Sequence, residues 1–168
     1  MDQAHLHLLL NHIPIIGTIF GIGFMAFGYL RKNQTITNAA KVVLIIVALL
    51  TIPTFFTGEP AEEILEKVVP DISGSMIHAH AEAAEFAFVA MLLLGALSLF
   101  SLWKKRAVRI YDLIILIFSI IVFIMMARVG NLGGQIQHKE IRGNSLLVSE
   151  GKTSSVLTDK HSTLTMIQ

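Results

Sequence analysis

Four long apolar runs constrain this chain more than any other feature of its sequence. They cover residues 8–29, 39–56, 79–103 and 110–129. Each run is close to the ~20 residues that an α-helix needs to cross a hydrocarbon core of about 30 Å. Lipid requires every backbone group to be paired within its span, and no barrel-like alternation of side chains is visible. The sequence therefore predicts an all-α membrane protein with four transmembrane helices.

The composition narrows the class of protein further. Only 15% of the 168 residues are charged, whereas a soluble domain carries about a quarter. The chain has no cysteine, which excludes disulfides, thiolate zinc sites, iron–sulfur clusters and covalently attached haem. The net charge of +1 provides no strongly basic face, so we expect the lipid bilayer, and no nucleic acid, as a partner.

The charges in the connections predict the topology. Seven basic residues lie in the first and third connections: Arg31, Lys32, Lys41, Lys104, Lys105, Arg106 and Arg109. The middle connection, residues 57–77, is acidic. Because basic connections stay in the cytoplasm, we predict an antiparallel four-helix bundle with both termini extracytoplasmic. Residues 1–142 form the transmembrane domain, and residues 143–168 form a polar extracytoplasmic tail.

Polar residues gather at the outer ends of the predicted helices. Ionisable side chains inside a span are costly and are usually functional, although those near the interface are often only solvated. His80 lies beside small alanines, which leave room for a bulky group. Arg128 lies inside the fourth span and needs an anionic partner. The candidate ligands of this rim are His12, Glu59, His78, His80, Glu82, Glu85 and His138.

Three segments resemble a small bacterial four-helix membrane domain family of uncharacterised function. Residues 11–17, Asn-His-Ile-Pro-Ile-Ile-Gly, are similar to its His-Phe-Pro-Ile opening, and residues 80–84, His-Ala-Glu-Ala-Ala, to its internal histidine motif. Residues 130–138 resemble its closing Gly-x-x-Gly-Gly-x-x-x-His, with Asn131 where the family commonly has histidine. The resemblance covers residues 5–142. Related domains are fused to c-type cytochrome modules, which implies a redox setting and a c-type cytochrome or respiratory complex as partner.

The first functional hypothesis is a b-type haem protein for membrane electron transfer. Two imidazoles that face each other across a bundle ligate the iron of such a haem. His12 and His80 are the expected pair, Arg128 would neutralise a propionate, and His138 would fold back over the site. This cofactor needs no cysteine because b-type haem is held without thioether bonds.

Two other hypotheses remain open. An Fe, Cu or Zn ion would take its ligands from the candidate residues named above, since imidazole and carboxylate suit these metals. Alternatively, the chain is a cofactor-free accessory subunit of a larger membrane complex. We favour an electron-transfer or accessory role over a stand-alone enzyme, because no Ser–His–Asp order, phosphate-binding glycine loop or His-Glu-x-x-His helix is present.

Overall fold

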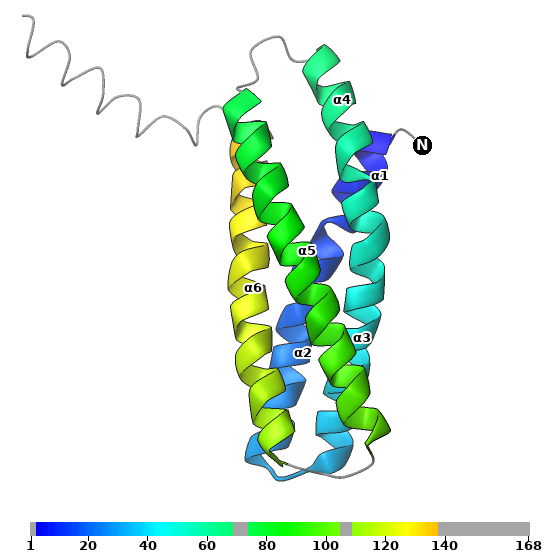
Figure 1. The fold of residues 1–168 in the computed structure, drawn as a ribbon, viewed down its shortest axis with the longest axis vertical. Helices are drawn as coiled ribbons and strands as arrows, with labels where there is room; N and C mark the ends of the chain where they lie inside the picture. The colour runs from blue at the N-terminus through cyan, green and yellow to red at the C-terminus, as the bar shows by residue number, and fades with distance from the viewer. Residues whose placement is uncertain (1–2, 69–73, 105–108, 138–168) are drawn as a thin grey trace, which may run out of the picture. The chain divides into compact units, whose positions relative to one another are not determined.

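The computed structural model describes residues 3–68, 74–104 and 109–137, which are almost entirely helical. Six helices follow one another along the chain (Figure 1): α1 (Gln3–Leu10), α2 (His12–Leu30), α3 (Gln34–Phe56), α4 (Gly58–Val68), α5 (Gly74–Trp103) and α6 (Arg109–Gln137). The chain divides into two compact units, residues 1–133 and 134–168, and the bundle belongs to the first. The predicted polar tail and His138 lie outside the described residues.

The prediction of four apolar helices is confirmed. Four helical stretches are long and apolar enough to cross a membrane: Ala4–Leu30, Gln34–Leu65, Gly74–Trp103 and Arg109–Ile136. Their surface is also apolar, since the side chains of Leu30, Phe86 and Trp103 are 76%, 63% and 75% exposed. Soluble monomers rarely expose so much large apolar surface. These features are compatible with an integral membrane protein.

The first stretch is interrupted at Asn11, between α1 and α2. Pro14 explains this break, because proline has no N–H to donate to the carbonyl of residue 10 in the preceding turn. The Thr54 hydroxyl, from α3, lies 3.4 Å from the Leu10 carbonyl and 2.9 Å from the Leu50 carbonyl of its own helix. The Thr54 hydroxyl therefore donates to the Leu10 carbonyl, which Pro14 leaves without its usual partner. This hydrogen bond joins the end of α1 to α3.

Glycines allow α2 to approach α3 closely. A Cβ atom added at Gly17 would overlap Val47, and one added at Gly21 would overlap Leu44. The sequence positions in α3 decrease as those in α2 increase, so these two helices run in opposite directions. The spacing of Gly17 and Gly21 predicts this close packing, and the structure confirms it.

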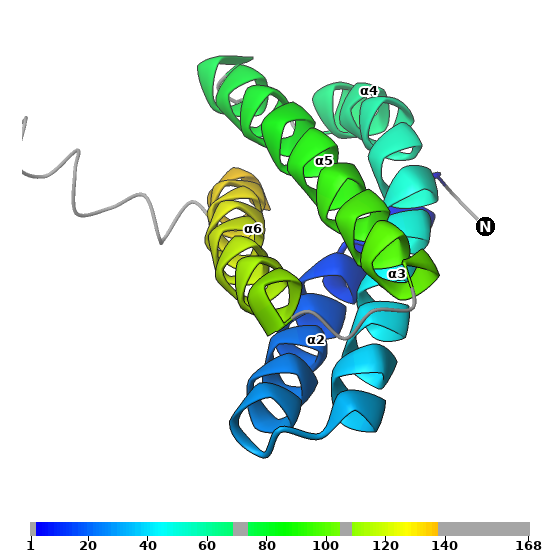
Figure 2. The same ribbon diagram turned by 60° about the horizontal axis from the view of Figure 1, so that its bottom comes forward.

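The core of the bundle lies between α2, α3, α5 and α6, which surround a common axis (Figure 2). Helix α3 packs against both α2 and α5. Helix α6 contributes apolar side chains to the same cluster. The buried hydrophobic residues are Met25, Ala40, Leu44, Val47, Ala48, Ala87, Met91, Leu94, Ile115, Val122 and Met126.

The acidic middle connection contains a helix that we did not predict. Helix α4 presents the partly buried Ala61, Ile64 and Leu65 on one side, while Glu59 and Glu63 are exposed. This spacing of three and four residues is typical of an amphipathic helix. Helix α4 packs against α1, which places its first residue, Gly58, beside His7.

Candidate functional site

His7 is seated between α1 and the end of α3. Its Nδ1 atom lies 3.1 Å from the Thr54 carbonyl oxygen and 3.2 Å from the Thr57 hydroxyl oxygen. The carbonyl can only accept a hydrogen bond, so Nδ1 carries the proton and donates it. The Nε2 atom of His7 therefore keeps its lone pair.

His80 is held in the same way by a different helix. Its Nδ1 atom lies 3.1 Å from the carbonyl oxygen of Val129 on α6. The donated proton again leaves Nε2 as the free acceptor of the ring. Gly133 lies so close that a Cβ atom there would sit 3.2 Å from Cε1 of His80, so the absence of a side chain lets the imidazole fit.

Two partly buried imidazoles come from distant parts of the sequence, His7 on α1 and His80 on α5, and they lie close enough for their charges to interact. We call the end of the bundle that carries His7, Thr54, His80 and Val129 the histidine end. Near His7, the Oδ1 atom of Asn11 is buried without a hydrogen-bond partner in the described structure, so this end holds an acceptor that lacks a donor.

His12 has a different environment from the one we expected. Its side chain is exposed, and its Nδ1 atom lies 2.9 Å from the Leu8 carbonyl, one turn earlier in the chain. A ring tied to its own stretch of helix lacks the contacts between helices that hold His7 and His80. His7 is absent from the predicted ligands, because a histidine near the membrane interface is often only solvated. The available signal is Pro14, which leaves the Leu10 carbonyl without its usual partner and so favours a contact with another helix.

The other predicted site residues are dispersed. His78, Glu59 and Arg128 are exposed, and His138 lies outside the described residues. Glu82 and Glu85 are exposed at a groove of about 470 Å³, lined by Phe86 and Leu93 of α5 and Phe118 of α6. Among the described residues, no group of three or more His, Asp or Glu side chains is placed to hold a metal ion.

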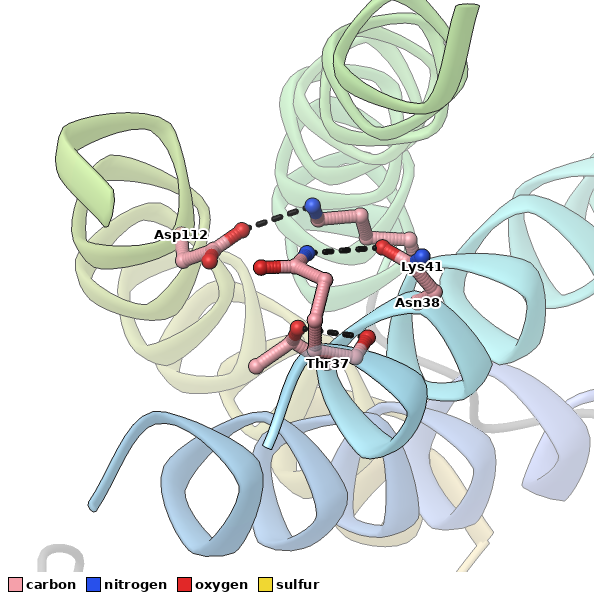
Figure 3. Close-up of polar contacts among 5 residues, drawn as sticks. Thr37, Asn38, Lys41 and Asp112 are labelled. Carbon is pink, nitrogen blue, oxygen red and sulfur yellow. Dashed lines mark hydrogen bonds and ion pairs between the residues drawn. The ribbon is translucent and has the colours of Figure 1, made fainter. Parts of the chain in front are cut away.

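A buried ion pair lies away from the histidine end. The Nζ atom of Lys41 on α3 lies 2.6 Å from Oδ1 of Asp112 on α6, and these side chains are 3% and 4% exposed (Figure 3). Nearby, the Gln34 amide donates to Asn38 over 2.9 Å, and the Thr37 hydroxyl donates to the Gln34 carbonyl over 3.0 Å. The expectation that Lys41 belongs to the first connection is wrong. Its long side chain reaches into the bundle because Asp112 compensates its charge.

No protein-family model, curated protein or solved structure matches this chain. The observations define a helical protein with four candidate membrane spans, one histidine that bonds to α3, another that bonds to α6, and an ion pair between α3 and α6.

Proposed function

We propose that this chain is a membrane-embedded b-type haem protein for electron transfer, in which His7 and His80 are the axial ligands. The observation that carries the proposal is the common state of the two rings. Each imidazole gives its Nδ1 proton to a main-chain carbonyl and keeps Nε2 for a ligand. Metal-binding histidines typically have this arrangement, because the hydrogen bond fixes the ring and raises its basicity.

The number of ligands favours haem over a bare metal ion. Zinc takes four ligands in proteins, and most sites for iron or Cu(II) also need more than two. Within the part of the chain that the structure describes, no group of three or more His, Asp or Glu side chains is placed to hold a metal ion. A porphyrin brings four nitrogen ligands of its own, so two imidazoles complete the coordination of its iron. Such a haem supplies one-electron chemistry.

Neighbouring groups are compatible with this cofactor. Gly58 and Gly133 lie beside the two imidazoles and add no side-chain bulk there. Arg128 precedes Val129, whose carbonyl holds His80, and would neutralise a haem propionate. The basic connections favour a haem near the extracytoplasmic face, and the family resemblance implies a bacterial inner membrane whose site faces the periplasm. The family resemblance supports a c-type cytochrome or respiratory subunit as electron partner.

The optical spectrum of the full chain tests the proposal. The protein would be produced with excess haem precursor, purified in mild detergent and measured before and after dithionite. We expect a Soret band at about one haem per chain, with the sharp bands of a six-coordinate low-spin iron after reduction. His7→Ala and His80→Ala should each abolish this spectrum or convert it to a five-coordinate form. The exposed His12 provides the matched control, since His12→Ala should leave the spectrum unchanged.

Other outcomes would overturn specific parts of the proposal. A folded wild-type protein without a Soret band would exclude haem. Stoichiometric copper, iron or zinc that disappears in His7→Ala and His80→Ala would instead indicate a bare metal site. If His12→Ala loses haem and His7→Ala does not, the protein binds haem but our choice of His7 as a ligand is wrong. Helical circular dichroism of each variant separates loss of a ligand from loss of the fold.

A further inference from the structure

A small polar cavity lies at the end of the bundle that carries the basic connections. Its volume is about 50 Å³, and it lies between the turn after α2 and the first turns of α3 and α6. The side chains that line it include Lys32, Asn33, Gln34, Thr37, Arg109 and Asp112. We call this group the basic-end cavity.

The cavity has an excess of positive charge. Its one lining carboxylate, Asp112, is already neutralised by Lys41. Lys32 and Arg109 form no ion pair within the described part of the chain. Arg109 is oriented by Tyr29, since its Nη2 atom donates to the Tyr29 carbonyl over 3.3 Å and its guanidinium lies 4.8 Å from the centre of the Tyr29 ring. Two cations therefore face the cavity, and one of them is held in a fixed direction.

Lys32 occupies a position where a lysine is unfavourable for the backbone. Its φ angle is +52°, in the left-handed region that glycine and asparagine adopt most readily. Glycine or asparagine would adopt this backbone conformation at a lower energetic cost than lysine does. A lysine here is consistent with a role for its side chain in the cavity.

The surroundings indicate a lipid ligand. Leu30 and Ile110 adjoin the lining residues Tyr29 and Arg109 in sequence, and their side chains are 76% and 54% exposed. Exposed apolar side chains thus adjoin two cations, and a phospholipid has the matching arrangement of an acyl chain joined to a phosphate. Basic pockets between transmembrane helices bind anionic headgroups in this way. We propose that the basic-end cavity binds the phosphate of an anionic phospholipid between Lys32 and Arg109.

Binding of short-chain lipids to the full-length protein in neutral detergent tests this proposal. Dioctanoyl phosphatidylglycerol would be titrated and followed by native mass spectrometry, with dioctanoyl phosphatidylcholine as the zwitterionic comparison. Each cation near a phosphate contributes about 1 kcal/mol, so Lys32→Asn and Arg109→Gln should each weaken phosphatidylglycerol binding about five-fold. Arg109→Lys keeps the charge and should retain most of the affinity.

Arg31 is the matched control for a specific site. It is exposed, adjoins Lys32 and carries the same charge, but it does not line the cavity and instead lies over the Phe27 ring. Arg31→Gln should change the affinity by less than two-fold. An equal loss in Arg31→Gln, or equal binding of phosphatidylcholine, would show that only general charge attraction operates. Competition by millimolar inorganic phosphate at the same sites would overturn the lipid assignment and indicate a site for a soluble anion. Unchanged melting temperatures establish that each variant is folded.

Discussion

Lys41 and Asp112 form a salt bridge of 2.6 Å that is almost completely buried and joins α3 to α6. The hydrogen bond from His80 to the Val129 carbonyl joins α5 to the opposite part of α6. Helix α6 thus has a polar attachment towards each end, with apolar residues such as Ile115 and Val122 between them. Its position depends on matched polar partners as well as on packing.

Removing one partner of the ion pair should strongly destabilise the bundle. Asp112→Leu leaves the Lys41 ammonium buried without a counterion, and breaking a buried pair in this way costs about 3–5 kcal/mol. The measurement is the free energy of unfolding in detergent. The double variant Lys41→Met/Asp112→Leu should recover most of this loss, because no unpaired charge remains.

The exposed pair of Glu63 and Lys67 provides a control for the ion-pair experiment. Its charged atoms are 3.9 Å apart and its side chains are 68% and 76% exposed, so Lys67→Gln should leave the free energy of unfolding almost unchanged. Equal effects of Asp112→Leu and Lys67→Gln would refute the burial of the Lys41 charge.

Adding a methyl group at Gly95 should separate α3 from α5. A Cβ atom at this position would lie 2.5 Å from Cβ of Ala48, and neither atom can rotate away. Gly95→Ala should therefore cost about 1–3 kcal/mol of stability. Gly23, which has nothing within 4 Å of its added Cβ, is the control. Gly23→Ala should be neutral or stabilising by up to about 1 kcal/mol, because alanine favours the helix. The two variants would be compared by thermal unfolding.

The orientation of the bundle can be tested with single cysteines, since the natural chain contains none. Glu63 on α4 and Lys104 after α5 are both exposed. If the basic connections are cytoplasmic, an impermeant maleimide should label Glu63→Cys in intact spheroplasts. Lys104→Cys should be labelled only after lysis. The reverse pattern would invert the predicted topology.

Thr57 should act as a positioning residue for His7. Its hydroxyl oxygen lies 3.2 Å from Nδ1 of His7, and the loss of such an outer partner lowers metal affinity by about 10–100-fold. Thr57→Val should lower the haem affinity by about 10-fold, the smaller of these losses, because the Thr54 carbonyl still accepts the His7 proton. The haem dissociation rate and the reduction potential provide the measurements, and the potential should rise as His7 becomes a weaker donor. Thr51→Val is the control, because Thr51 donates within its own helix to Val47.

Arg128 should tune the same haem without holding it. Removing a cation near the cofactor destabilises the more negative reduced state, so Arg128→Leu should lower the reduction potential while the Soret intensity is kept. A redox titration of both proteins measures the difference. An unchanged potential would place Arg128 away from the haem.

The sequence predicts the spans well because their length and apolar character are local properties. It predicts the functional contacts less well because these depend on how each helix is rotated. His80 was chosen for its neighbouring alanines, and it does lie in the bundle. The sequence favours His12 over His7 because His12 lies deeper in the predicted span and within a segment of the family resemblance. His7 contacts the end of α3, where its partners Thr54 and Thr57 are far away from it in the sequence.

The ion pair illustrates the same limit. Lys41 lies near the start of a span, where a lysine is usually exposed at the interface. Its burial is explained by Asp112 on α6, more than seventy positions further along the sequence. The pair could have been predicted from two opposite charges that lie one or two turns inside different spans. Ionisable side chains in lipid typically pair with one another.

The distance along the chain between Lys41 and Asp112 has a consequence for biosynthesis. Chains emerge from the N-terminus at about 5–20 residues per second, so Lys41 is inserted before the helix that neutralises it exists. Until α6 is synthesised, the Lys41 ammonium of the nascent protein has no Asp112 to pair with. A chain truncated before α6 would keep that charge uncompensated, and burying it would then carry the full cost of an unpaired charge in lipid. The salt bridge thus forms only after synthesis has reached α6.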